Sequence, residues 1–296
     1  MKQLASIYNF YKQGYIIPAF NLRVLTFDSA KAFFRAAKKL GTSLFIIELA
    51  QSEIGYTSQT PKVFAKDILK AAKAENYRAP IYLQADHYKP AGKAGELEKL
   101  IKKAVKAGFY NIDIDCSALP LSENIAKTNF YIDFIKKIQP KNVTINIGGE
   151  VGDIGGANTQ PQELEVFLQN VKDINKVAVQ TGTAHGKGGQ IDWQLLQNLS
   201  QIAKQHGLPG VVQHGASTLS ESDLRKLSQH GVCEVHLATE IMDTILKHPD
   251  FPYKIQKKEI GAYKNKIDKI PQLVKDKIML AIEEKFNFFL SLFCVF

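Results

Sequence analysis

The stretch PIYLQADHYKPAGKAGELEKLIKKAVKAGFYNIDID, residues 80–115, predicts a strand, a helix and a second strand. Residues 80–86 are mostly apolar, and the Pro and Gly residues after them favour a loop. Gly95–Ala107 mixes lysines with apolar residues, as an amphipathic helix does. Residues 109–115 then form a second apolar run. Strands joined through a helix lie parallel, so this stretch is one βαβ unit.

The same alternation runs along most of the chain. Further strands are predicted at 15–21, 43–50, 143–150, 176–182, 209–214 and 234–239. Further helices are predicted at Phe27–Leu40, Lys62–Asn76, Ser122–Ile138, Gln162–Val171, Trp193–His206 and Glu221–Gln229. Eight such units predict an α/β fold of the (β/α)8 TIM-barrel type. A doubly wound open sheet is the rival, but no GxGxxG turn follows the first strand.

Composition narrows the class of protein. The chain has 296 residues, 45% hydrophobic and 23% charged, and we expect one domain over 1–296 with a helical tail from about 241. No run of eighteen apolar residues occurs, and the three cysteines are scattered, which favours a cytoplasmic protein without membrane partners. The net charge of +9 comes mostly from lysines on predicted helices, so nucleic acid is not an expected partner. The apolar end FNFFLSLFCVF (286–296) is expected to dock on the barrel or on a partner subunit.

Reactive side chains gather where the predicted strands end, which is where barrels carry their chemistry. These side chains are Asn21, Asp86, His87, Asp115, Glu150, His185 and His214, with His236 inside the last strand. A lone histidine near a core is usually structural, but three at strand ends beside a glutamate match the ligands of a divalent metal such as zinc. The histidines at 206, 230 and 248 fall in or beside helices and are expected at the surface.

Glycines add a second indication. Gly182 and Gly186 flank His185, and HGAS (214–217) follows the seventh strand. Glycine lets backbone N–H groups approach an anion, and barrel loops after strands 7 and 8 often bind phosphate. A phosphorylated substrate would also suit the basic net charge. Lys176, at the edge of strand 6, is the one lysine within strands 2 to 7.

In order along the chain, these pieces resemble the class II, metal-dependent fructose-bisphosphate aldolase family, including tagatose-bisphosphate aldolases. The resemblance covers about residues 3–245. The matching pieces are PAFN (18–21), AQSEIGY (50–56), LQADH (83–87), IDCSALPLSENI (114–125), GGEVGDIGG (148–156), VQTGTAHGKG (179–188), VVQHGAS (211–217) and VHLATE (235–240). Each is weak alone, but eight in order on the expected strands are specific. The resemblance implies a TIM-barrel carbon–carbon lyase of glycolysis and carbohydrate metabolism.

The resemblance also implies a metal and an acid/base. His87, His185 and His214 would bind zinc or another divalent ion, with Glu150 as a further or alternative ligand. Asp86 would take the proton of the C4 hydroxyl as the carbon–carbon bond breaks, a step worth roughly 10²–10⁴-fold. The metal would stabilise the resulting enediolate as a Lewis acid. A monovalent cation is a further candidate ion.

The implied substrate is fructose or tagatose 1,6-bisphosphate, cleaved to dihydroxyacetone phosphate and glyceraldehyde 3-phosphate. Substrate and phosphate contacts would come from Asn21, Ser52, Gly186, Gly215, Ser217, His236 and Thr239, with Asp115 supporting the site. Family members are usually dimers or tetramers, so a homodimer or homotetramer is expected. A catalytically altered paralogue that binds metal and sugar phosphate, and a metal-dependent barrel hydrolase, are the alternatives.

Three positions depart from the family pattern. His236 stands where the family usually has a substrate-contacting asparagine, and it either contacts substrate or metal or fills the barrel interior. The loop ANTQPQELE (157–165) has Glu163 as its first acid, where a helix is expected to begin, and Asp153 precedes the paired glycines. Thr218 replaces a glycine of the expected phosphate loop.

Asp86 and His87 raise a geometric problem, because neighbours on a regular strand point to opposite faces. For both to serve one site, we expect the strand to end at about Asp86, with the chain turning there.

Overall fold

A computed structural model describes the chain except residues 1–2, 11–14, 91, 153–154, 184–189 and 294–296. Eight parallel strands close into a barrel in the order β1 to β8, with each strand paired to its neighbours in sequence and β8 paired to β1. The strands are β1 (Ile17–Asn21), β2 (Ile46–Ala50), β3 (Tyr82–Tyr88), β4 (Phe109–Ile114), β5 (Asn146–Val151), β6 (Lys176–Val179), β7 (Val211–Gln213) and β8 (Val232–Leu237). The predicted (β/α)8 barrel is confirmed.

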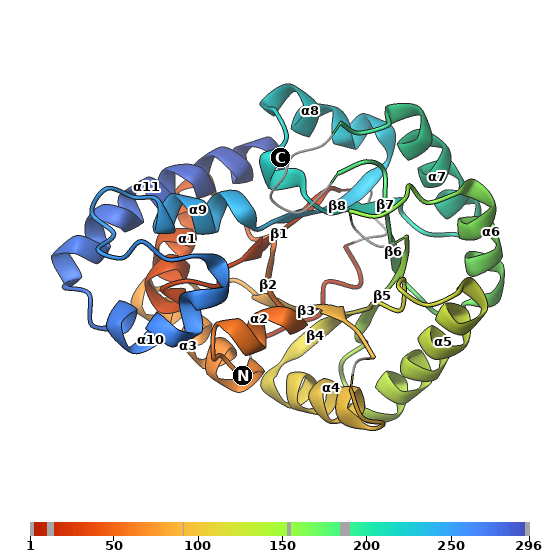
Figure 1. The fold of residues 1–296 in the computed structure, drawn as a ribbon, viewed down its shortest axis with the longest axis horizontal. Coiled ribbons are helices and arrows are strands. Elements are labelled where there is room, and N and C mark those ends of the chain that lie inside the picture. Colours follow the sequence, from red (N-terminus) through yellow and green to blue (C-terminus); the bar gives the residue numbers. More distant parts are fainter. Residues whose placement is uncertain (1–2, 11–14, 91, 153–154, 184–189, 294–296) are drawn as a thin grey trace.

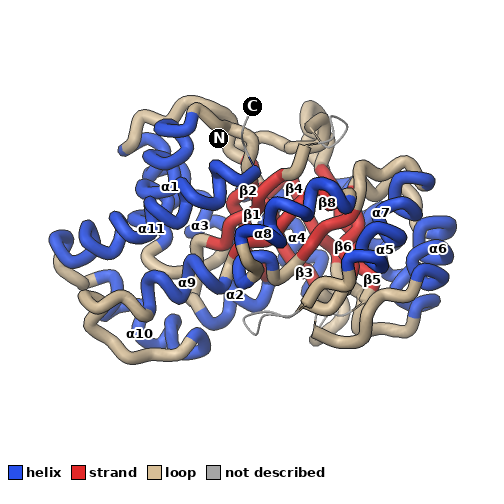
Figure 2. Tube along the Cα trace, turned by 90° about the horizontal axis from the view of Figure 1, so that it is seen from above, coloured by secondary structure: helices blue, strands red, loops and turns tan. Residues whose placement is uncertain are grey.

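Helices surround the barrel on all sides (Figures 1 and 2). They are α1 (Thr26–Leu40), α2 (Gln51–Tyr56), α3 (Pro61–Ala74), α4 (Glu96–Ala107), α5 (Leu121–Ile138), α6 (Pro161–Asn170), α7 (Trp193–Gln205), α8 (Glu221–Lys226), α9 (Thr239–Leu246), α10 (Ile260–Asp268) and α11 (Gln272–Phe293). The seven helices expected between strands are present, with ends shifted by up to a few residues. The short helix α2 was not expected, because its six residues are too few for a periodic pattern.

Helix α4, from the stretch that first indicated the fold, shows how the sequence sets its boundaries. Gly95 precedes it with φ 83°, and Gly108 follows it with φ 95°. This left-handed conformation favours glycine, and at Gly108 an added Cβ would lie 2.2 Å from a methyl group of Leu4. The helix therefore stops where the chain must pass under the N-terminal segment.

The N-terminal segment closes one end of the barrel. Leu4 forms an isolated bridge with Ile81, and the backbone N–H of Ile7 donates to Asn111 Oδ1 over 3.1 Å. Ile7 also joins a small apolar cluster with Ile17 and Tyr82, the first residues of β1 and β3. The N-terminal segment thus fills the end of the barrel at which the strands begin. The opposite end, where the strands finish, is left for a functional site.

The apolar C-terminal end docks on the barrel as far as it is described. Helix α11 lies along α1 (Figure 1), and Phe286 contacts Phe33 and Phe20 at ring-centre distances of 5.0 Å and 5.8 Å. Phe286 and Leu290 are fully buried. Within the described residues, no helix is both long enough and apolar enough to cross a membrane.

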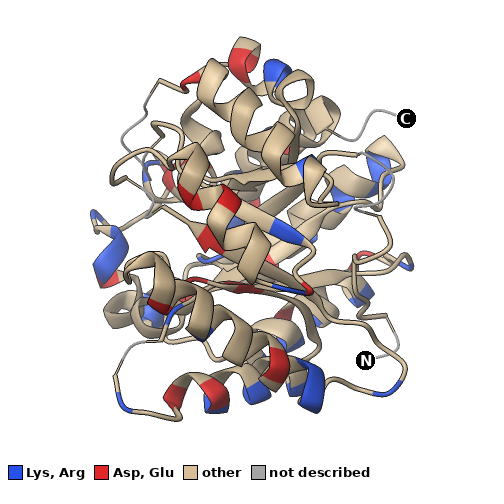
Figure 3. Ribbon diagram, turned by 90° about the vertical axis from the view of Figure 1, so that its right-hand side faces the viewer, with Lys and Arg blue, Asp and Glu red and all other residues tan. Residues whose placement is uncertain are grey.

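Charged residues cover the outer helices. On the side shown in Figure 3, Lys and Arg lie on several separate helices and are interspersed with Asp and Glu. This distribution is that of solvated helix faces on which charges of both signs are mixed.

Candidate active site

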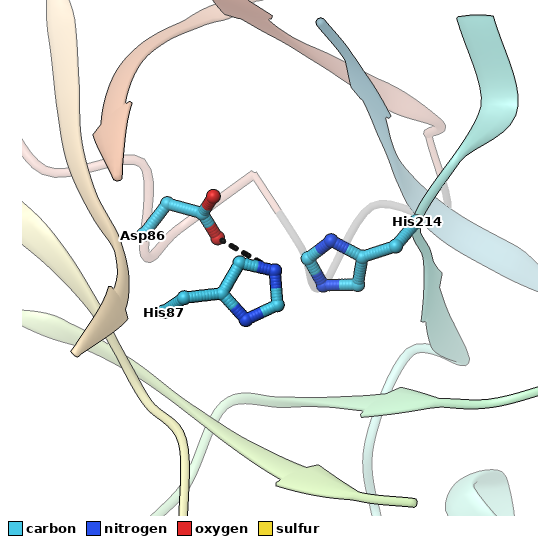
Figure 4. Close-up of side chains that lie close together, drawn as sticks. All are labelled: Asp86, His87 and His214. Carbon is cyan, nitrogen blue, oxygen red and sulfur yellow. Dashed lines mark ion pairs between the residues drawn. The ribbon is translucent and has the colours of Figure 1, made fainter. Parts of the chain in front are cut away.

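A bulge in β3 places Asp86 and His87 together. Ala85 pairs with Ile112 and Tyr88 pairs with Ile114, so β3 has one extra residue between these pairs. His87 has φ 48°, a left-handed conformation that few non-glycine residues adopt. The expectation that the strand ends at Asp86 is wrong, because β3 continues to Tyr88. The bulge, rather than a strand end, turns two neighbouring side chains toward the same site (Figure 4).

One small cavity of about 120 Å³ at the carboxyl ends of the strands collects most of the predicted site residues. Predicted residues that line it are Asn21, Ser52, Asp86, His87, His214, Gly215, Ser217, His236 and Thr239. Glu150 and Asp115 do not line the cavity but contact His87 from behind. The predicted residues His185 and Gly186 lie outside the described part of the chain.

His87 is held by two carboxylates on one ring nitrogen. Its Nδ1 lies 2.8 Å from Asp115 Oδ2 and 3.0 Å from Glu150 Oε2. Lys89 Nζ in turn lies 2.8 Å from the same Asp115 oxygen. A metal-binding histidine commonly donates its second ring N–H to a carboxylate, which fixes its tautomer and orientation. This arrangement leaves Nε2 of His87 facing the cavity.

The carboxylates also shift the protonation of the site. Burial disfavours charge on His87, but Asp86 and Glu150 outweigh it and raise the pKa of His87 well above its usual value. Burial raises the pKa of Asp86 to about 6 and that of Glu150 to about 8, against the opposing charge of His87. Burial opposes ionisation of Asp115 as well, yet its hydrogen bond to His87 and the charges of His87 and Lys89 hold its pKa well below the usual range. The carboxylates around His87 thus favour positive charge on its ring.

The donor set fits a divalent metal ion. One ligand atom from each of Asp86, His87 and His214 lies within 4.8 Å of the others, and the His87 and His214 rings are 4.4 Å apart. Figure 4 shows these three side chains converging from β3 and the end of β7. The two imidazoles are of the kind that bind catalytic zinc, and the Asp86 carboxylate lies beside them. Glu150 forms a separate group with His87 and Asp115, behind the His87 ring.

The loop after β7 offers backbone and hydroxyl donors. Gly215 has φ 69° and begins a short 3-10 turn, Ala216–Thr218, and Ser217 lines the cavity. Thr239 begins helix α9, whose N-terminal N–H groups carry partial positive charge. Thr218, a departure from the family pattern, donates its hydroxyl to the Gly215 carbonyl over 3.1 Å. The turn is therefore closed by a side-chain hydrogen bond where the family has glycine.

Two cationic residues of the cavity were missed by sequence reasoning. Arg23 is 6% exposed, and its guanidinium contacts Glu53 Oε1 at 2.9 Å and the Tyr56 hydroxyl at 2.9 Å. Lys257 Nζ lies 5.1 Å from the Tyr56 ring centre, and burial together with Arg23 lowers the pKa of Lys257. Arg23 follows Asn21 by two residues and could have been suspected. Lys257, from the segment before α10, carried no sequence signal.

The acid in the loop after β5 has a structural role. Glu163 is the third residue of α6, and its carboxylate accepts the backbone N–H of Gln160 over 3.2 Å. This capping box confirms that a helix begins there and places Glu163 at the surface. Asp153, the other acid considered, lies outside the described residues.

A charged layer fills the barrel beneath the cavity, where TIM barrels usually hold Val, Ile and Leu. Lys176 points into the barrel, and its Nζ contacts Glu234 Oε1 at 2.6 Å, Gln84 Oε1 at 2.7 Å and Asp113 Oδ1 at 3.0 Å. Lys176 is 1% exposed and Glu234 is fully buried. His236, whose role the sequence left open, lines the cavity and contacts Glu234 of this layer.

Comparison with solved structures agrees with the barrel. The YdjI aldolase from Escherichia coli K12 superposes with a TM-score of 0.72 at 20% identity, over 98% of this chain and 97% of that one. A putative fructose-1,6-bisphosphate aldolase from Coccidioides immitis gives 0.72 at 20% identity, over 99% and 97%. Fructose-bisphosphate aldolase from Campylobacter jejuni gives 0.66 at 18% identity, over 97% and 93%. At these identities the likeness shows a shared fold.

The family match covers more of the chain than the quoted motifs, which ended at about residue 245. The model of the class II fructose-bisphosphate aldolase family matches residues 3–291, which includes α9, α10 and nearly all of α11. The match therefore spans the barrel, the cavity and the C-terminal helices. This chain belongs to the class II fructose-bisphosphate aldolase family and is an enzyme of the carbon–carbon lyase class.

Proposed function

We propose that this enzyme reversibly cleaves a ketose 1,6-bisphosphate, of fructose or tagatose, to dihydroxyacetone phosphate and glyceraldehyde 3-phosphate. The observation that carries the proposal is the β3 bulge, which sets the carboxylate of Asp86 beside His87 and His214 in one cavity. An acid/base next to a metal-ligand group is what a metal-dependent retro-aldol reaction requires. The proposal also rests on membership of the family.

His87, His214 and the predicted ligand His185 would hold zinc, and Glu150 is the alternative ligand. When bound, a divalent ion supplies Lewis-acid stabilisation of negative charge on the ketone oxygen of the substrate. Asp115 would keep the His87 ring in the orientation and tautomer that presents Nε2 to the cavity. The expected monovalent cation stays a prediction.

Asp86 would take the proton of the C4 hydroxyl during cleavage and return it during condensation. Burial raises the pKa of Asp86 to about 6, so its carboxylate is ionised at neutral pH yet remains a better base than an ordinary aspartate. A base in this range suits a reaction that runs in both directions.

Two groups of donors in the cavity would hold the two phosphates. Gly215, Ser217 and the α9 terminus at Thr239 offer neutral donors, which suit one phosphate. Lys257 has no ion-pair partner among the described residues, and Arg23 lies in the same cavity with Ser52. Burial and the charge of Arg23 lower the pKa of Lys257, and Glu53 opposes this shift, so a substrate anion beside both cations would add a favourable interaction. These cations favour a substrate with a second anionic group.

The test is direct turnover. Purified protein, loaded with zinc and with its metal content measured, should cleave fructose or tagatose 1,6-bisphosphate, and EDTA should abolish the activity. Zinc should restore it. Binding of the sugar bisphosphates without turnover would instead indicate the altered paralogue, and hydrolysis of an ester or amide would indicate the barrel hydrolase.

The subunit assembly and compartment also stay predictions. A homodimer or homotetramer in the cytoplasm is proposed from the family alone. Sedimentation of the purified protein would measure the subunit number.

A further inference from the structure

His236 joins the charged layer of the barrel to the cavity. It lies on β8 and is 3% exposed, and its Nε2 is 2.7 Å from Glu234 Oε1. Its Nδ1 faces the other way, 3.1 Å from Glu48 Oε2 and 3.5 Å from Asp86 Oδ1. One imidazole therefore spans from a buried carboxyl group to the acid/base.

Glu234, which contacts Nε2 of His236, is itself held by further hydrogen bonds. Glu234 Oε1 also accepts hydrogen bonds from Lys176 Nζ at 2.6 Å and from Gln84 Nε2 at 2.9 Å. Gln84 Nε2 reaches Glu48 Oε2 at 3.2 Å, which holds the second neighbour of His236. These side chains come from β2, β3, β6 and β8, so neither neighbour of the ring can move without disturbing buried polar contacts.

One oxygen of the Asp86 carboxylate lacks a hydrogen bond within the described part of the chain. Its Oδ1 is buried and accepts no hydrogen bond from the described residues. The nearest ring nitrogens are His236 Nδ1 at 3.5 Å and His87 Nε2 at 3.9 Å.

We propose that His236 is a positioning residue. The Lys176–Glu234 ion pair holds its ring, and the ring orients the Asp86 carboxylate. The proposal rests on the function proposed above and deepens it, because it assigns a task to the position where the family usually has asparagine. The asparagine side chain is too short to reach from Glu234 to Asp86. Misplacement of a reacting group by about 1 Å can cost on the order of 100-fold in rate.

The first experiment separates two steps of the reaction in the zinc-loaded enzyme. Cleavage needs Asp86, whereas exchange of a carbon-bound proton of dihydroxyacetone phosphate with deuterated water does not involve the C4 hydroxyl. His236→Asn should lower kcat for cleavage about 10- to 100-fold, change KM less than about threefold, and leave exchange within about twofold. Metal content should equal that of the wild type. The matched control is His206→Asn, at a histidine that pairs with Glu165 on the outer helices and should alter nothing.

A double-mutant cycle then asks whether His236 acts through Asp86. In the Asp86→Asn background, His236→Asn should lower cleavage by no more than about twofold, because the group it orients is gone. Equal losses in both backgrounds would overturn the proposal. So would a rise in KM at constant kcat, which marks a substrate contact, or a parallel loss of exchange and cleavage. Unchanged kinetics would show that His236 only fills the barrel.

A second measurement does not depend on substrate. In crystal structures of the zinc-loaded proteins, the Asp86 carboxylate should turn away from its wild-type position in His236→Asn, while His87 and His214 stay in place. Glu234→Gln, which removes charge with little change of shape, should give a smaller turn in case His236→Asn does not fold. An unmoved carboxylate in both variants overturns the proposal. A wild type that cleaves neither sugar would overturn the proposed function, while the crystal structures would still decide the positioning.

Discussion

At the residue scale, the site depends on one backbone irregularity. A regular β3 would separate Asp86 and His87 onto opposite faces, and the extra residue with His87 at φ 48° brings them together. Positive φ at a non-glycine residue costs about 1–3 kcal/mol and persists only when the surroundings enforce it. The contacts of His87 with Asp115 and Glu150 supply that enforcement.

The two neighbours should fail in different ways when truncated. His87→Ala should lose metal, whereas Asp86→Ala should keep metal and lose roughly 10²–10⁴-fold in turnover, because only a proton-transfer group is removed. Metal analysis and cleavage assays on the same samples check both statements. Loss of metal in Asp86→Ala would instead make Asp86 a ligand.

The raised carboxyl pKa values predict how the metal-free protein responds to pH. The pKa of Glu150 is raised from 4.5 to about 8 and that of Asp86 from 3.8 to about 6. Between the lower and upper values the folded state binds more protons than the unfolded state, so the free energy of unfolding falls as pH rises. His87, whose pKa is also raised, acts in the same direction.

Urea denaturation in EDTA at pH 5, 6.5 and 8 measures this slope. Glu150→Gln should make the slope shallower between about pH 4.5 and pH 8, because the variant has no carboxyl group to ionise there. Glu123→Gln, at an exposed carboxylate of α5, serves as the control and should leave the slope unchanged. A Glu150→Gln slope equal to the wild type would contradict the assignment.

At the element scale, α11 is the part whose pattern was least informative. Its apolar end was compatible with docking on the barrel or on another subunit, because its residues are apolar on more than one side. The structure resolves this for Phe286, which lies against Phe20 of β1 and Phe33 of α1. Leu280, on the same helix, is 65% exposed.

The two sides of α11 should therefore differ in energy. Phe286→Ala should lower the free energy of unfolding by about 3–5 kcal/mol, through lost transfer energy and the cavity that remains. Leu280→Ala should change it by less than about 0.5 kcal/mol. Chemical denaturation of the zinc-loaded proteins measures both. Equal effects would mean that α11 docks with another face.

At the scale of the whole molecule, the interior of the closed barrel holds charged side chains. Lys176 contacts the amide of Gln84 on β3 and the carboxyl groups of Asp113 on β4 and Glu234 on β8. These two carboxyl groups share its positive charge. Its sequence position at a strand edge concealed this, because a lysine at a strand end usually reaches solvent. The closed barrel removes that route.

Removal of the shared cation should destabilise the entire fold. Lys176→Met should cost about 3–5 kcal/mol, because the fully buried Glu234 and the partly buried Asp113 would be left without their partner. Lys172→Met, at an exposed lysine before the same strand, should have little effect. Thermal and urea unfolding test the pair. Equal stability of the two variants would show that the buried carboxyl groups are protonated and need no cation.

The sequence by itself determined the barrel and most members of the site. Alternating apolar and amphipathic segments are local patterns, and parallel strands bring their carboxyl ends to one edge, so Asn21, Asp86 and His214 could be placed together without coordinates. Only the tertiary structure decided the bulge at His87, the entry of Arg23 and Lys257 into the cavity, and the link from Lys176 through Glu234 to His236. Those features depend on contacts between residues far apart in the chain. Neither periodicity nor motif spacing carries distances of that kind.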